Sequence, residues 1–193
     1  MKNLTKLALS LVAVGALTGC FGGTKVSEEK FQEKINAIEA HEYSKAVVSY
    51  SINMTGTGTY KSEKASGKIE FTYDKDAKMW TTESSDDHAL ECRSYIMTIR
   101  GQKISSYKPD SSDIKYTTTY YVNPLKVVVK VKGTSKGDYS TVKMDQTVTS
   151  QFDKYGYTTK YTTKYNNSFE YGTSGVSVSG TQKGTESYTI SYK

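Results

Sequence analysis

Histidine and cysteine, which often supply catalytic bases, nucleophiles and metal ligands, are scarce in this sequence. The chain has two of each among its 193 residues. A hydrolase or transferase needs a nucleophile with a base in reach, and only His41 and His88 offer an imidazole. His41 ends a predicted helix and His88 lies among acidic residues, so we expect both to cap helices at the surface. The sequence therefore predicts a protein that is not an enzyme and has no catalytic residues and no cofactor.

A metal centre needs several ligands close together, and one local group offers them. Asp86, Asp87, His88 and Cys92 lie within seven residues of one another. Adjacent aspartates at a helix start commonly interact with the helix dipole, and His88 and Cys92 could supply at most two ligands. Residues 74–76 begin like a calcium-binding loop, but lysine and methionine follow where a ligand and the invariant glycine belong. We therefore expect no metal site, a tight turn at residues 74–76, and Cys92 as a small buried side chain.

Long apolar runs are absent after residue 17, and the one before it is short. Residues 7–17 are apolar apart from one serine, but a membrane span needs about 20 such residues. The run follows Lys2 and Lys6, which is the order of a secretory signal peptide. It ends in Leu17-Thr18-Gly19-Cys20, which resembles the bacterial lipobox. The alternative is an ordinary cysteine behind a secretory signal.

The lipobox resemblance implies a lipid-anchored protein. Residues 1–19 would be cleaved between Gly19 and Cys20, and the Cys20 thiol would carry diacylglycerol. Two or more acyl chains anchor a protein stably where one does not. The expected location is the extracytoplasmic face of a membrane in the cell envelope. With Cys20 lipidated, Cys92 has no partner for an intramolecular disulfide. Residues 20–26 are expected to form a flexible leader and residues 27–193 one domain, of a size that supports one core.

The sequence also lacks a concentrated basic segment. The formal net charge is +6, but the lysines are spread through strand-like segments, which argues against a nucleic-acid partner. Lys154, Lys160 and Lys164 lie among tyrosines and could contact anionic polymers or lipid headgroups. The alternative is a solvated strand face whose lysines discourage edge pairing. The pattern gives no information on oligomeric state.

Tyrosine and threonine are abundant instead, and both favour extended chain. The chain has 17 tyrosines, two prolines and one tryptophan, Trp80, for which we expect a packing role. One amphipathic helix is predicted over residues 28–42, because Phe31, Ile35 and Ile38 share a face. Ser27 is its expected N-cap.

After this helix the apolar period changes from 3.6 to 2, which predicts strands. A short helix is expected within residues 84–97 and an exposed loop at residues 101–113. The tail, residues 171–193, is expected to form a last hairpin or edge strands. Strands with turns between them are predicted over residues 46–55, 69–73, 78–82, 114–122, 125–132, 142–148 and 157–165.

A helix followed by many antiparallel strands with one helical insert, in a lipobox-bearing chain, resembles the LolA-like lipoprotein-carrier superfamily, which includes LolA, LolB, LppX and LprG. The resemblance rests on element order. It implies an α+β fold in which a strongly curved antiparallel sheet, a half-open barrel, is covered by helices on one side. It also implies an apolar cavity that binds a lipid or another amphiphile. The cavity would be lined by Phe31, Ile35, Ile38, Val48, Tyr50, Ile52, Ile69 and Phe71.

Two functions remain open on this basis. The first is a membrane-tethered lipoprotein that binds or carries an amphiphile in that cavity. The second is a structural or interaction lipoprotein in which the same side chains form a filled core. It would contact cell-wall polymer or a partner protein. Periodicity shows which face is buried but not whether the space behind it is filled.

Overall fold

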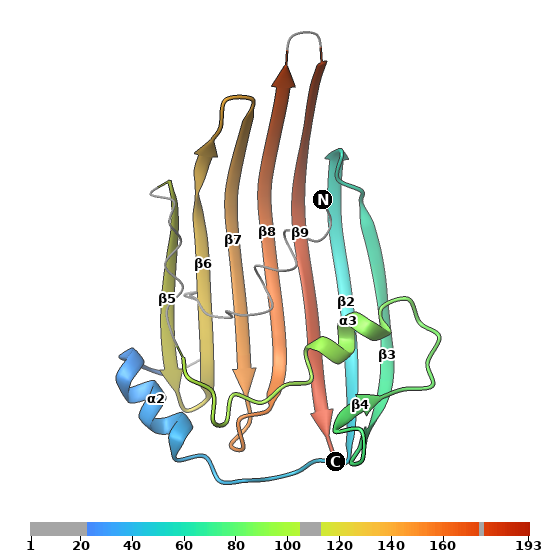
Figure 1. Ribbon diagram of the computed structural model, residues 1–193, viewed down its shortest axis with the longest axis vertical. Helices are drawn as coiled ribbons and strands as arrows, with labels where there is room; N and C mark the ends of the chain where they lie inside the picture. Colours follow the sequence, from blue (N-terminus) through green and yellow to red (C-terminus); the bar gives the residue numbers. More distant parts are fainter. Residues whose placement is uncertain (1–22, 105–112, 174–175) are drawn as a thin grey trace.

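The computed structural model describes residues 23–104, 113–173 and 176–193, and their strands form one antiparallel sheet (Figure 1). The sheet has nine strands in the order β1-β5-β6-β7-β8-β9-β2-β3-β4, and it is open, with β1 and β4 at its edges. The strands are β1 (Thr24–Val26), β2 (Lys45–Gly58), β3 (Glu63–Asp74), β4 (Met79–Thr81), β5 (Ile114–Val122), β6 (Leu125–Lys136), β7 (Ser140–Phe152), β8 (Thr158–Thr173) and β9 (Val176–Tyr192).

Two meanders join to make this sheet. One runs from β2 to β4 and the other from β5 to β9, and β9 pairs with β2 from Ala46↔Tyr192 to Gly58↔Gly180. The last hairpin therefore exists, but the tail supplies only one long strand of it, β9, and the other strand is β8. The prediction of edge strands is wrong, because β9 lies between β8 and β2 in the interior of the sheet.

The first helix, α2 (Glu28–Asn36), begins where the sequence predicts and ends earlier. The Ser27 side chain caps it by accepting a hydrogen bond from the Lys30 amide at 3.3 Å. The predicted end at residue 42 is wrong: Ala37 is the C-cap, and the chain then runs toward the start of β2. His41 therefore does not end the helix. Its carbonyl instead accepts a hydrogen bond from the Tyr157 phenol at 2.9 Å.

The second helix, α3 (Ala89–Ser94), confirms the predicted short insert over a smaller range than residues 84–97. It lies in the connection that follows β4, and residues 82–104 of this connection cross one face of the sheet (Figure 1). In the same view α2 lies beside the lower end of β5 and α3 lies over β2 and β3. Of the predicted loop at residues 101–113, residues 105–112 lie outside the described residues.

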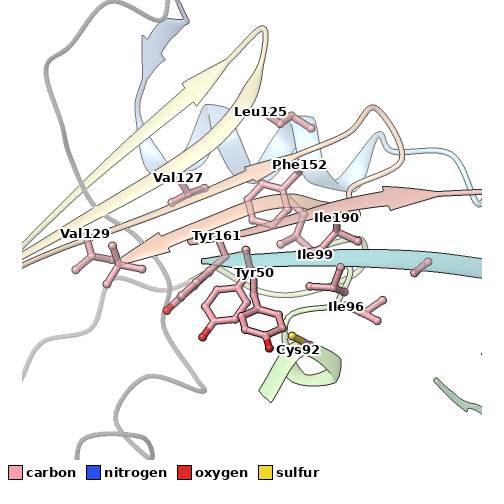
Figure 2. Packing of buried hydrophobic residues seen from close by; sticks show 14 of the residues in the cluster. Tyr50, Cys92, Ile96, Ile99, Leu125, Val127, Val129, Phe152, Tyr161 and Ile190 are labelled. Carbon is pink, nitrogen blue, oxygen red and sulfur yellow. The ribbon is translucent and has the colours of Figure 1, made fainter. Parts of the chain in front are cut away.

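The core lies between the sheet and these two helices, on what we call the inner face. Alternate residues of β2 are buried, from Ala46 to Met54, as the period of two predicts. Figure 2 shows Tyr50 and Tyr161 of the sheet beside Cys92 of α3, with Ile96 and Ile99 following along the connection. Phe31 and Ile35 of α2 belong to the same cluster, and both are fully buried. The opposite, outward face of the sheet carries mainly polar side chains.

No helix within the described ranges has the length and apolar character that crossing a bilayer requires. The predicted signal peptide, Gly19 and Cys20 lie outside the described residues. The described part of the predicted leader is not all coil, because Thr24–Val26 form β1 and pair with β5.

Candidate functional site

The eight side chains predicted to line a cavity are brought together on the inner face. Phe31, Val48 and the other members are buried, and Ile38 is half-buried against them. They pack within one cluster; for example, the Phe31 and Tyr120 ring centroids are 5.0 Å apart. The fully or nearly fully buried members are Phe31, Ile35, Val48, Tyr50, Ile52, Ile69 and Phe71.

Two surface hollows among the described residues lie elsewhere and have polar linings. One, of about 300 Å³, lies between Lys143 and Lys183 and is lined by asparagine, serine, threonine and glutamine as well. The other, of about 330 Å³, lies where the β6–β7 turn meets the far ends of β8 and β9, and Tyr139 and Glu170 line it. Neither hollow includes a residue of the predicted cavity.

The middle of the inner face carries buried polar groups. Tyr95, Tyr161 and Tyr188 pack together, with the Tyr95 ring 4.3 Å and 4.2 Å from the other two centroids. Burial raises the pKa of the Tyr161 phenol to about 12, and burial also raises the pKa of the Tyr188 phenol. Within the described part of the chain, three buried side-chain atoms lack a hydrogen-bond partner: Tyr188 Oη, Ser150 Oγ and Gln146 Nε2. Such atoms are costly unless water or a ligand satisfies them.

The four candidate metal ligands do not converge. His88 Nε2 lies 3.6 Å from a Glu63 carboxylate oxygen, and His88 Nδ1 lies 3.8 Å from Glu91. Cys92 is fully buried in the core, and burial raises the pKa of its thiol to about 12. No three histidine, cysteine, aspartate or glutamate side chains in the described ranges are placed to hold a metal ion together.

The predicted tight turn at residues 74–76 is confirmed. Asp74 Oδ1 accepts hydrogen bonds from the Asp76 and Ala77 amides, each at 2.9 Å. Trp80 of β4 packs against Tyr73 and Tyr192, with ring centroids 5.2 Å and 6.3 Å away.

An aromatic cluster, which the sequence analysis did not identify, lies at one end of the sheet. The His41 ring stacks on Tyr155 at 4.0 Å, and Tyr43 stacks on Tyr192 at 4.8 Å. Asp153 organises the cluster, because Oδ2 accepts a hydrogen bond from the Tyr43 phenol at 2.8 Å. Its Oδ1 accepts the Tyr155 and Tyr157 amides at 2.9 Å each. These residues come from distant segments, so spacing in the sequence carries no signal for their meeting.

The outward face is the most strongly charged surface that the strands build. Register places its lysines on the side opposite the core, since Lys160 pairs with Thr189 and Lys164 with Thr185, while the buried Tyr161 pairs with Tyr188. We call the exposed lysines of this face, with the serines and threonines between them, the lysine face. Its lysines are Lys25, Lys45, Lys64, Lys68, Lys115, Lys130, Lys132, Lys136, Lys143, Lys160, Lys164 and Lys183.

Few carboxylates share this face. Those at outward strand positions are Glu70, Asp74, Asp145 and Glu170. Asp145 lies 3.4 Å from the Lys132 ammonium. One corner of the outward face is buried, at Thr119, Lys126 and Val128, and the lysine face does not include it.

The prediction for residues 154–165 needs a correction. Lys160 and Lys164 lie on β8, which is an interior strand, so these lysines cannot protect a sheet edge. Lys154 lies in the turn before β8, and its ammonium is 4.7 Å from the Tyr155 ring centroid. Alternation of lysine with apolar residues along β6 and β8 was a signal for one charged face. Only the order of the strands in the sheet shows that the lysines of β6 and β8 belong to one continuous face.

Comparisons of this chain with protein-family models, with curated proteins and with solved structures found no match.

Proposed function

We propose that this protein is a lipid-anchored lipoprotein of the cell envelope. Its folded domain is a non-enzymatic binding domain, and the lysine face is its binding surface. The observation that carries this proposal is the contrast between the two sides of the sheet. The side chains that would line a ligand cavity are packed into the core. The lysines at outward positions of the strands, in contrast, are exposed together on one face. An exposed surface with an excess of positive charge attracts an oppositely charged partner over a Debye length.

The anchor can be tested separately from the face. A Cys20→Ala variant should leave the detergent phase and the membrane fraction, because it has no thiol to esterify. The mature N-terminal peptide of the unaltered protein should begin at residue 20 and carry diacylglycerol. An unmodified residue 20, or an intact Met1, would contradict the anchor.

The contact role is tested in the Cys20→Ala background, where association with isolated envelopes no longer depends on lipid. We define a face variant, Lys130→Gln with Lys164→Gln and Lys183→Gln, which removes exposed charge from three strands. We also define a control variant, Lys30→Gln with Lys34→Gln and Lys103→Gln, whose exposed lysines lie on α2 and the connection. The face variant should lose low-salt association and the control variant should keep it. Equal loss in both would contradict a face-specific role.

A second candidate is the amphiphile-binding role implied by the LolA-like resemblance. The unpartnered Tyr188 Oη, Ser150 Oγ and Gln146 Nε2 favour it, because a polar headgroup on the inner face would satisfy such atoms. This role requires the open sheet to curve into a half-open barrel around the ligand. Native mass spectrometry of the gently purified protein would support it by detecting a co-purifying lipid. A ligand-free mass and no melting shift with added lipid would count against it.

A further inference from the structure

We propose that the lysine face docks on the anionic headgroups of the membrane that holds the anchor, so that the sheet lies flat on the bilayer. This inference rests on the lipid anchor proposed above and names the partner of the lysine face. Three features of the described residues support it: the two-dimensional spread of the lysines, the position of the first strand, and the distribution of carboxylates.

The lysines are spread over an area and do not follow a line. Across the sheet, Lys130 of β6, Lys164 of β8 and Lys64 of β3 lie in one row, separated by Thr147, Thr185 and Asn53. Along β8, Lys160 and Lys164 are four residues apart, which is about 13 Å in a strand. A single polymer chain would contact one row or one strand at a time. A planar array of anionic headgroups contacts many rows together.

The first strand keeps the anchor close to one edge of the sheet. Thr24 begins β1, and Lys25 pairs with Tyr121 on the outward side of the edge. Thr24 lies four positions after Cys20, and four extended residues span at most about 14 Å. The sheet edge therefore stays within that distance of the lipidated residue, and the lysine face lies within reach of the headgroups.

The balance of charge differs between the two sides of the sheet: acidic residues outnumber basic ones in α2 and along residues 82–104, whereas lysines outnumber carboxylates on the lysine face. Glu28 and Glu29 begin α2, and Asp86, Asp87 and Glu91 lie along the connection over the inner face. The reversed orientation would place these acids against anionic headgroups. Basic side chains near an anionic membrane surface are attracted to it and acidic ones are repelled, within about a Debye length.

The test measures orientation on the purified mature lipoprotein, reconstituted into bilayers with or without roughly 30% phosphatidylglycerol. A fluorophore is attached at Ser51→Cys, an exposed outward position of β2, or at Leu90→Cys, which is 72% exposed on α3. Cys92 is fully buried and is expected to stay unlabelled. Nitroxide-labelled headgroups should quench the probe at residue 51 only in the anionic bilayer. The probe at residue 90 should stay bright in both.

Charge and salt provide the controls. The face variant should lower the ratio of docked to undocked protein roughly tenfold or more, and the control variant should leave it unchanged. About 0.5 M salt should release the docked domain. Equal quenching at residues 51 and 90 would overturn the proposal, and so would quenching at residue 51 that the face variant does not reduce. So would binding of a soluble polyphosphate to the lysine face with no docking on anionic lipid. A peptide mass showing an unmodified Cys20 would instead contradict the proposed anchor alone.

Discussion

Tyr50 of β2 donates a hydrogen bond to Asp86, with 2.8 Å between the phenol oxygen and Oδ2. Asp86 Oδ1 also accepts the His88 amide at 2.8 Å. The hydrogen bond from the His88 amide, which is the larger cause, and the hydrogen bond from the Tyr50 phenol, which is the smaller one, hold the pKa of Asp86 below its ordinary value. Burial, the largest cause, and the bond to Asp86 raise the pKa of Tyr50 to about 12. This pair ties the inner face of the sheet to the connection that carries α3.

We expect Tyr50→Phe to lower the free energy of unfolding by about 1 kcal/mol at neutral pH, because it removes this hydrogen bond and keeps the ring. Urea denaturation measures the change. The folded-state pKa of Asp86 is lowered, so its contribution is present above the ordinary value of 3.8 and is lost as the pH falls through the folded-state pKa. The free energies of unfolding of Tyr50→Phe and of the unaltered protein should therefore become equal at acid pH. Tyr139→Phe is the control, since Tyr139 is 61% exposed. A difference that persists unchanged at acid pH would contradict this account.

Gly67→Ala should disturb the same pair from the neighbouring strand. A Cβ at residue 67 would lie 2.6 Å from the Tyr50 ring, and the ring would have to move. We expect a loss of about 1–3 kcal/mol in the free energy of unfolding, as is usual for overpacking. In a Tyr50→Leu background the same substitution should cost much less, because the clashing ring is gone. An equal cost in both backgrounds would show that the contact is not the cause.

Asp153→Ala should loosen the aromatic cluster at the end of the sheet. It removes the acceptor of the Tyr43 phenol and of the Tyr155 and Tyr157 amides. We expect a loss of roughly 2–3 kcal/mol in thermal or urea unfolding, with weaker near-ultraviolet circular dichroism from the tyrosines. Asp138→Ala, in the exposed turn before β7, should change stability by no more than about 0.5 kcal/mol. The prediction fails if the two variants are equally stable.

Alkaline pH should unfold the domain cooperatively. Burial raises the pKa of Tyr43, Tyr50 and Tyr161 to about 12 each, from an ordinary value of 10.0. A raised folded-state pKa means that the neutral phenol is stabilised, so this contribution is complete below pH 10 and is lost as the pH rises toward about 12. Phenolate absorbance and far-ultraviolet circular dichroism should change together in that window. Titration of every tyrosine near pH 10 with an intact sheet would refute the prediction.

Local patterns predicted the elements well where one face is buried. The period of two in β2 identified its buried residues from Ala46 to Met54. The first helix was predicted from Ser27 onward, but its end was not, because residues 38–44 are held by partners from the turn before β8 and from the C-terminal end of the chain. The Tyr157 phenol binds the His41 carbonyl, and Tyr155 stacks on the His41 ring. Propensity and periodicity contain no information about such distant partners.

The sequence alone determined which residues alternate between a buried and a solvated side, because the side-chain period of a strand is a local property. The pattern of apolar, lysine and threonine residues in β6 and β8 already placed Lys130 and Lys164 opposite the core. Only the tertiary structure decided that β9 joins β2 to β8 and so aligns the lysines of separate strands in rows across one face. Strand order depends on pairing between segments far apart in the chain, which no local pattern records.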